Sequence, residues 1–544
     1  MMRYRLAVLL LSASFSLMAG VPAVKIKVAD QNQFDHLQSS ILQALSTGTD
    51  RIDVSIDRGT YFFREDHIRL EYQEAPGVTL TIDGGGSVFL GTGPDFLLSG
   101  GSAPYPGTYD VRHGFYSYRT GGTLFPTGKV GKALSPVEPC LGASGLFRLK
   151  VAEEDWTPDA RDAAYIVISQ WYLGRCYRIE KIRSGYIYFR SQDTLLEMNG
   201  DITYGRSFPK YMFYNYPLSG ADVHISGGKI HAEEEKVHQC EASRFLTVWN
   251  GSLGHLVIKD IHFAGNGGKD YLIQLFMAKM ESAEVSGCTF SGIQDRVLST
   301  HCISHVAFHD NVVRDCWRLA LYLDMFSDQA EVYRNRFENI GCAFEGTAVM
   351  EVLGAGMAVH DNVLQDFSYA GIMSGIHFTC DQPVSTSGLI ERNELFHSDA
   401  FRKEPSRTLM DAGAIYVGTM NAGLVIRNNY IHDIRGAKDY RGIFGDDGAY
   451  GVTVYGNLVL DTPTSYSIDF RRVASVETRA DSYAERVNVD NRIYGNTVDG
   501  KVRFETRGGD DGCYKGENRV LKTDAERRSA VAAWRRKYGR HLPR

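Results

Sequence analysis

A short apolar–polar pattern recurs along the second half of the chain and predicts its fold. The pattern is an apolar residue, two variable residues, Asn, one variable residue and a second apolar residue, and it repeats between Ser304 and Val498. Successive asparagines lie 24 to 39 residues apart. The shortest spacing is about one coil of a parallel β-helix, and the longer ones are a coil plus a loop. The seven asparagines are Asn311, Asn335, Asn362, Asn393, Asn429, Asn457 and Asn496.

The physics of a β-helix explains this pattern. Each coil pairs its backbone with the coils above and below, about 4.8 Å away. A coil therefore needs inward apolar residues and a polar residue at the corner. Asn tolerates left-handed backbone angles and can hydrogen-bond to an Asn in the next coil. We predict that the seven asparagines form a structural ladder, and that the chain is an all-β solenoid with a small antiparallel β insertion and short capping helices.

A second pattern, five residues long, precedes each asparagine by about eleven residues. Its second and fourth positions are mostly apolar or small and should point inward, so the third and fifth should point outward. An outer face with stacked acids, glycines and aromatic rings is unlike an ordinary solvated face, and it predicts an active groove. By this alignment the third column reads Tyr322, Val349, Met373, Tyr416, Phe444 and Asp469, and the fifth reads Asp324, Glu351, Gly375, Gly418, Asp446 and Arg471.

The acids of the fifth column are the candidate catalytic residues. Asp324 and Glu351 are expected in the same column of adjacent coils, with Cα atoms about 5 Å apart. Two carboxyl groups that close cannot both ionise freely, and a retaining glycosidase needs this arrangement. Asp446 should lie three coils beyond Glu351, roughly 14 Å away. It could work with Asp447 in a neighbouring subsite or pair with Asp411. The alternative is that these acids satisfy arginines or cap turns.

Four further residues are candidates for contacting a substrate. His301 and His377 fall one or two positions past the fifth column, although a lone histidine is more often a satisfied surface or core group. Arg471 ends the column, and its guanidinium could hold a carboxylate or sulfate, or pair with Asp469 or Asp446. Tyr416 is the aromatic candidate on the same outer face.

The chain divides into five predicted segments. A basic start, an apolar run and small residues form a secretory signal peptide, so we expect export to the periplasm or beyond. The apolar run is too short to span a membrane comfortably.

The capping-box pattern Thr523–Glu526 predicts a helix to about Tyr538. The segments are a signal peptide (1–20), an N-terminal cap with a helix near 35–45 and the first coils (21–99), the antiparallel insertion (100–217), the β-helix (218–515) and a basic C-terminal helix (516–544).

Charge and cysteine content narrow the function further. The net charge of −6 argues against a protein that coats nucleic acid. The nine cysteines contain no CxxC pair, and their spacing fits no zinc site. We therefore predict no cofactor, and we leave open whether a calcium ion binds.

Three stretches resemble a known superfamily: Asp411–Tyr416, Val425–Asp433 and Gly442–Asn457. They are similar to the right-handed parallel β-helix proteins of the pectate-lyase-like superfamily, closest to the glycoside-hydrolase branch of gut Bacteroidota. The resemblance covers about residues 25–510, and its strongest motif is Asp446-Asp447-Gly448. It implies a polysaccharide-degrading enzyme with Asp411, Asp446 and Asp447 in the cleft. The superfamily also contains lyases, epimerases and tailspikes, so the fold does not fix the reaction.

Three functions are consistent with these observations. The first is a glycoside hydrolase that cleaves a polysaccharide or oligosaccharide with paired carboxyl groups. The second is a polysaccharide lyase that acts by β-elimination on a uronic-acid glycan, with Arg471 neutralising the uronate and His377 or a lysine as the base. The third is a non-catalytic glycan-binding solenoid.

Overall fold

The computed structural model describes most of the solenoid and parts of the insertion. The described residues are 23–63, 65–91, 243–266, 271–293, 296–316, 318–324, 326–341, 347–375, 387–402, 412–418, 423–435, 440–446, 449, 451–470, 490–504 and 512–543, with short stretches between 108 and 232.

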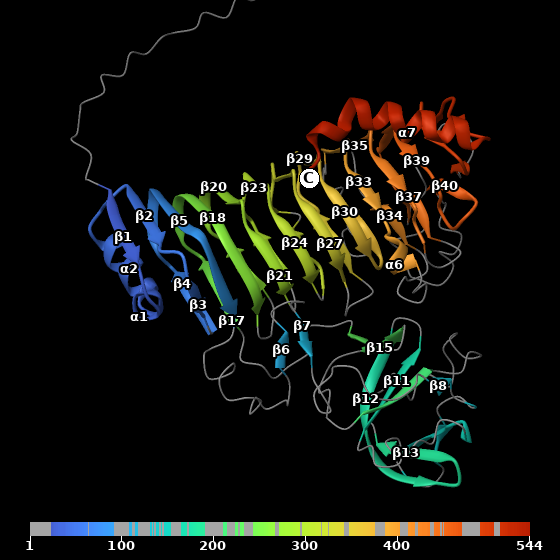
Figure 1. The fold of residues 1–544 in the computed structure, drawn as a ribbon, viewed down its shortest axis with the longest axis horizontal. Helices are drawn as coiled ribbons and strands as arrows, with labels where there is room; N and C mark the ends of the chain where they lie inside the picture. Colours follow the sequence, from blue (N-terminus) through green and yellow to red (C-terminus); the bar gives the residue numbers. More distant parts are fainter. Residues whose placement is uncertain are drawn as a thin grey trace, which may run out of the picture.

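Parallel strands stack into three ribbons that run the length of the solenoid, as the ordered colours of Figure 1 show. Each coil contributes one strand to each ribbon. Two ribbons form one continuous sheet because the long strands β5 (Glu74–Gly91) and β18 (Ser252–Asn266) belong to both. The first ribbon contains β1 (Val24–Val28), β2 (Arg51–Ile56), β20 (Lys279–Ser286), β23 (Val306–His309), β26 (Glu331–Tyr333), β29 (Met357–His360), β32 (Gly388–Glu391), β35 (Leu424–Arg427), β38 (Thr453–Tyr455), β41 (Arg492–Tyr494) and β44 (Tyr514–Lys515).

The second and third ribbons complete each coil. The second contains β3 (Thr60–Phe62), β21 (Thr289–Ile293), β24 (Val312–Cys316), β27 (Arg336–Ile340), β30 (Val363–Phe367), β33 (Glu394–Phe396), β36 (Tyr430–His432), β39 (Leu458–Val459), β42 (Thr497–Val498) and β45 (Arg519–Val520). The third contains β4 (Glu65–Glu71), β17 (Ser243–Trp249), β19 (Tyr271–Phe276), β22 (Arg296–His301), β25 (Leu321–Leu323), β28 (Ala348–Val352), β31 (Ala370–Ser374), β34 (Gly413–Val417), β37 (Arg441–Gly445), β40 (Tyr466–Phe470) and β43 (Lys501–Phe504).

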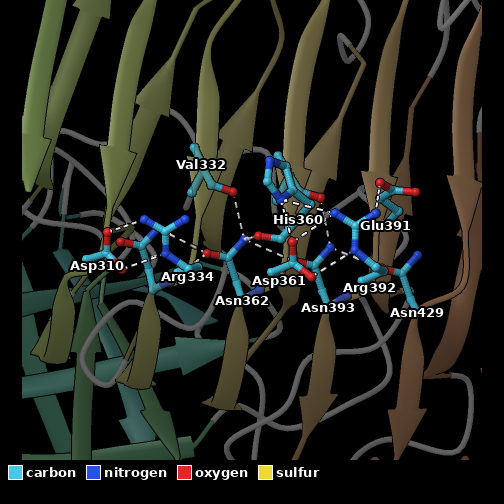
Figure 2. Close-up of polar contacts among 12 residues, drawn as sticks. Asp310, Val332, Arg334, His360, Asp361, Asn362, Glu391, Arg392, Asn393 and Asn429 are labelled. Carbon is cyan, nitrogen blue, oxygen red and sulfur yellow. Dashed lines mark hydrogen bonds and ion pairs between the residues drawn. The ribbon is translucent and has the colours of Figure 1, made fainter. Parts of the chain in front are cut away.

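The predicted asparagine ladder is confirmed and joins the first ribbon to the second (Figure 2). The side-chain amide of Asn362 donates to Asn393 Oδ1 at 2.9 Å and to the Val332 carbonyl of the preceding coil at 2.8 Å. Its own oxygen accepts from the amide of Asn335 at 3.0 Å. The ladder continues one coil beyond the predicted seven, to Asn518.

One detail of the ladder prediction is wrong. The left-handed residue at each corner is the one before the asparagine, such as Arg334 (φ 53°), Asp361 (φ 57°) and Arg392 (φ 55°). The asparagine itself is held inward by its amide bonds, so the turn falls on its neighbour. These neighbours pair across coils, as Figure 2 shows for Asp361 and Arg392. Although burial opposes it, hydrogen bonds from His360 and Arg392 lower the pKa of Asp361 to about 2.

Two short helices, α1 (Gln31–Asp35) and α2 (Leu37–Ser46), cover the first coils, near where the sequence predicts a capping helix. Leu37 and Ile41 are buried on the inner side of α2. Phe34 stacks on His67, with ring centroids 4.2 Å apart, and packs edge-on against Phe89. The cap therefore covers the imidazole of His67, a residue of β4, with the Phe34 ring.

His67 should make the stability of this cap depend on pH. Burial lowers the pKa of His67 to about 4, whereas the unfolded chain keeps a value near 6.5. As pH falls from 6.5 to 4, the unfolded state binds a proton that the folded state does not, so the free energy of unfolding decreases by about 3 kcal/mol. We expect His67→Phe to remove most of this decrease. Urea unfolding at several pH values measures it, with exposed His36→Gln as the control. A pH dependence unchanged in His67→Phe would contradict the assignment.

The insertion is antiparallel, as the sequence predicts. Its seven-stranded sheet has the order β8 (Gly131–Lys132), β14 (Lys210–Tyr214), β11 (Tyr165–Gln170), β12 (Leu173–Arg183), β13 (Tyr186–Arg190), β10 (Leu146–Lys150) and β9 (Glu138–Pro139). Two hairpins flank it in the sequence: β6 (Thr108–Asp110) with β7 (Phe115–Ser117), and β15 (Val223–Ser226) with β16 (Lys229–Ala232). The second hairpin lies in the stretch from 218 where the sequence predicts coils. Its strands pair antiparallel, from Val223 with Ala232 to Ser226 with Lys229, whereas strands of neighbouring coils pair in parallel.

The C-terminal helix α7 (Asp524–Tyr538) begins at the expected capping box of Thr523 and Glu526. It lies along the side of the late coils, above β35 and β39 in Figure 1. Trp534 is 6% exposed and its indole N–H donates to the Asn428 carbonyl at 2.8 Å. Arg535 pairs with buried Glu394. Basic side chains of the helix therefore dock it on acidic side chains of the solenoid.

Trp534 should decide whether α7 stays docked. Removing a buried indole costs about 3–5 kcal/mol, so Trp534→Ala should detach the helix while leaving the coils folded. Hydrogen exchange of residues 524–538 measures this, and it should rise strongly in Trp534→Ala and stay unchanged in exposed Arg536→Ala. Equal protection in both variants would show that the tryptophan does not anchor the helix.

Two further short helices lie among the described residues: α6 (Asp399–Arg402) and the 3₁₀ turn η3 (Gly539–His541). Within the described part of the chain, no helix combines the length and apolar character needed to cross a membrane.

Candidate active site

The third ribbon carries the predicted acids, but the pairing of one strand differs from the prediction. Tyr322 of β25 lies beside Glu351 of β28, and Leu323 lies beside Val352. Asp324, one residue further, therefore comes level with Leu353 rather than with Glu351. The expectation that Asp324 and Glu351 share a column is wrong. They are diagonal neighbours, with Cα atoms about 8 Å apart for strand spacings of this kind.

The error has a simple physical origin. Side chains of a strand point alternately to its two faces. Shifting a strand by one residue against its neighbour would therefore turn its apolar side chains outward, whereas shifting it by two residues keeps them inward. The predicted alignment places the segment 347–351 two residues away from its actual pairing with β25. Met350 and Val352 point inward in both the predicted and the observed alignment. Only the backbone pairing reveals the difference.

The other rungs of the third column pair as predicted. Met373 lies beside Tyr416, Tyr416 beside Phe444, and Phe444 beside Asp469. The strand before Asp446, β37, is the third strand beyond β28, as expected. The outward side of the third ribbon therefore holds Glu351 in the third column and Asp324 and Asp446 in the fifth.

Asp324 is a buried, firmly held carboxylate. It is 3% exposed. Its Oδ1 accepts hydrogen bonds from the Ser327 hydroxyl at 2.7 Å and from the Phe326 backbone N–H at 3.2 Å. Its Oδ2 contacts Nδ1 of His301. The Ser327 hydroxyl in turn accepts from Thr300 at 2.9 Å. Both oxygens of Asp324 are thus fixed before any ligand binds.

His301 stands in the fifth column itself, not past it as the sequence alignment suggests. It ends β22 beside Phe276 of β19. The two rings stack with centroids 4.6 Å apart, and Phe276 stacks on Trp249 at 4.1 Å. Phe326 meets the imidazole edge-on at 5.6 Å. The His301 side chain is 33% exposed, so one side of the ring reaches solvent while the rest is clamped.

Tyr322 lies between the two acids and belongs to the site although the sequence reasoning gave it no role there. Burial raises its pKa, and the negative charges of Glu351 and Asp324 raise it further. The phenol therefore stays protonated at neutral pH and can donate a hydrogen bond. The Arg296 guanidinium stacks on the Tyr322 ring at 5.1 Å and on the Tyr271 ring at 5.0 Å.

Asp446 and Tyr416 form a second buried pair. The Tyr416 hydroxyl donates to Asp446 Oδ2 at 2.8 Å. Asp446 is 9% exposed and Tyr416 only 1%. Tyr416, the aromatic candidate for contacting a substrate, has a covered ring that packs edge-on against Phe444. Tyr416 instead holds the carboxyl group of Asp446.

Asp469 illustrates the alternative role for an acid on this face. It is fully buried and accepts hydrogen bonds from Arg441 at 3.0 Å and from Arg503 at 2.6 Å. Arg441 also stacks on the Phe444 ring at 4.2 Å. This carboxylate accepts the hydrogen bonds of two arginines, so the last residue of the third column has a structural role.

Four predicted site residues lie outside the described residues: Asp411, Asp447, His377 and Arg471. Their predicted roles stay predictions. In the described ranges, no group of three or more His, Cys, Asp or Glu side chains is placed to hold a metal ion.

The sequence contained a signal for the His301 contacts. Trp249, Phe276, His301 and Asp324 follow one another at intervals of 27, 25 and 23 residues, each about one coil. Extending the fifth column of the repeat to the coils before residue 320 would have placed these four residues in that one column. The role of Ser327 had no comparable signal because it lies in an irregular turn after the column.

The stacked parallel ribbons define the chain as a right-handed parallel β-helix. No family model matches the chain, and no curated protein matches it. A solved structure titled "Glycoside hydrolase" matches it with a TM-score of 0.52 and 11% identity, over 93% of this chain and 98% of the other. A second, "The complex structure of XylC with xylose", has a TM-score of 0.38 and 8% identity, over 90% and 86%. At 11% identity, the likeness to the first of these structures concerns the fold alone.

Proposed function

We propose that this protein cleaves glycosidic bonds of a polysaccharide, with the substrate lying along the outward side of the third ribbon. The observation that carries the proposal is the cluster of Asp324, Tyr322 and Glu351 on neighbouring strands, with His301 against Asp324. Elsewhere on the outer surface, acids such as Asp310 and Asp361 are paired with arginines. A carboxylate held by a histidine and a serine, next to a tyrosine, is equipped for proton transfer.

The spacing of the acids favours one form of hydrolysis. Adjacent carboxyl groups, about 5 Å apart, suit a covalent intermediate and retention, whereas separations of about 6.5–9.5 Å leave room for a water molecule and give inversion. Asp324 and Glu351 are diagonal neighbours rather than directly paired, so their carboxyl groups have more room between them than a directly paired set would, and we infer the inverting form from this offset. We infer that Glu351 protonates the leaving oxygen while water attacks from the side of Asp324.

A polysaccharide lyase is the second candidate, favoured by the His301 imidazole against Asp324, with Tyr322 two residues before Asp324 in the chain. A β-elimination needs a base at C5 of a uronate and an acid at the leaving oxygen. The described residues offer the base, but the group predicted to neutralise the uronate, Arg471, lies outside them.

A panel of plant and host polysaccharides tests the proposal. Release of reducing ends without an ultraviolet-absorbing unsaturated product supports hydrolysis, and proton NMR of the first anomer formed distinguishes inversion from retention. A product that absorbs in the ultraviolet would favour the lyase. Binding without turnover on every glycan would favour a non-catalytic solenoid. Export to the periplasm or beyond is part of the proposal, because a polysaccharide substrate lies outside the cell, and fractionation with N-terminal sequencing tests it.

A further inference from the structure

We propose that His301 is the proton-transfer residue of this site and that Asp324 acts through it as a positioning residue. The inference rests on the proposed function and changes the role of Asp324 from a direct participant to the group that orients the base. It identifies the reacting atom as Nε2 of His301.

The first argument is the tautomer. Asp324 Oδ2 contacts Nδ1 of His301, and an ionised carboxylate can only accept a hydrogen bond. In the neutral imidazole the proton therefore sits on Nδ1, which leaves the lone pair on Nε2. Among the described residues we find no hydrogen bond to Nε2, and the side chain is 33% exposed. The atom left available to water or a substrate is thus the basic one.

The second argument is rigidity. The Asp324 carboxylate is fixed by Ser327 and by the Phe326 backbone N–H. The imidazole plane is fixed by the stacked Phe276 ring and by the Phe326 edge. A base held in one orientation does not have to search for it during the reaction, which is how a carboxylate–histidine pair contributes to catalysis.

The third argument is the contrast with other histidines of the chain. His309 and His360 also contact a carboxylate through Nδ1, but that carboxylate is the next residue and is shared with an arginine. His432 is buried, with both ring nitrogens bound, to Asp433 and Glu394. In the described ion pairs, the Asp324 carboxylate pairs with His301 and with no arginine. Its charge is therefore available to stabilise a protonated imidazole.

The step itself balances without a further reactant. Nε2 of His301 accepts a proton from water as the water oxygen bonds to the anomeric carbon. The bond from that carbon to the leaving oxygen breaks, and Glu351 gives its proton to this oxygen. The imidazolium, held by Asp324, later releases its proton to solvent, and Glu351 is reprotonated. Water and glycoside thus yield a free anomeric hydroxyl and an alcohol.

Kinetics test the role of the base. His301→Gln should lower kcat by about 10²–10⁴-fold with little change in KM, because the ring is not needed to bind the sugar chain. His309→Gln, which removes an outward histidine from the first ribbon, should leave both constants unchanged. If His301→Gln and His309→Gln both turn over like the wild type, the proposal is wrong while the proposed function stands. His301→Asn serves as a second variant if the first does not fold.

Nitrogen NMR of histidine-labelled protein tests the geometry without substrate. The His301 signals, assigned by their loss in His301→Gln, should show the Nδ1-protonated tautomer in the wild type. Asp324→Asn should shift the population toward Nε2-protonated and lower kcat with KM nearly unchanged. A wild-type His301 protonated on Nε2 would overturn the proposal directly. Wild-type protein with this tautomer but no turnover on any glycan would instead overturn the proposed function, and with it the catalytic role.

Discussion

Glu351→Gln is expected to lower kcat by about 10³-fold, within the usual range for loss of a general acid. Glu351 is the half-buried residue of β28, beside Tyr322 and Met373 in the neighbouring strands. Glutamine keeps the size and the hydrogen-bonding shape of the side chain but cannot give a proton to the leaving oxygen. Substrate binding should therefore persist, and the loss should fall on kcat rather than KM. Initial rates on the best glycan of the panel measure the change.

The loss should depend on how good the leaving group is. An aryl glycoside with an acidic phenol needs little protonation, so Glu351→Gln should act on it far more weakly than on the natural linkage. Glu331→Gln is the matched control, since Glu331 is an exposed residue of β26 on the first ribbon. Full activity of Glu351→Gln on the polysaccharide would remove Glu351 from the site. The hydrolase would then need another acid, and Asp446 would be the next candidate.

Asn362→Ala is expected to destabilise the solenoid by about 3–5 kcal/mol. The Asn362 amide is fully buried and donates to the Val332 carbonyl. Its oxygen accepts from the backbone N–H of Asn335 at 2.9 Å. Alanine leaves these two buried backbone groups without their partner, at about 1–3 kcal/mol each, and also interrupts the side-chain ladder of Figure 2. Urea unfolding followed by circular dichroism measures the difference.

The control for the ladder lies on the same coil. Gln365→Ala removes an amide of similar size from the outward side of β30, where water can replace its bonds, so it should cost less than about 1 kcal/mol. If Asn362→Ala were no worse than Gln365→Ala, the ladder would not be a main source of stability. Solenoids unfold by coils rather than as one unit, so the loss should first appear near 332–393.

Local sequence patterns predicted much of the fold because they reflect short-range physics. The asparagine repeat follows from the need to satisfy buried amides at each corner. The Thr523–Glu526 capping box begins α7 where the pattern places it. The helix near 35–45 follows from its apolar spacing, and Leu37 and Ile41 are indeed the buried residues. In each case the residues that decide the structure lie within a few positions of one another.

The candidate site was only partly predictable. The third ribbon's outward side and the number of strands between Glu351 and Asp446 were anticipated from coil counting. The contact of His301 with Asp324 was not, although both residues had been singled out. The burial of Tyr416 was also missed, since alternation shows which way a side chain points but not what covers it.

By itself the sequence determined that the chain coils, where its corners fall and which faces look outward, since these depend on alternation, corner chemistry and capping. The tertiary structure alone decided which outward residues meet. A two-residue slip of β28 leaves the pattern of apolar residues intact, so nothing local distinguishes Glu351 beside Asp324 from Glu351 beside Tyr322. The backbone hydrogen bonds between coils make that choice, and they place the carboxylate of Asp324 against the ring of His301.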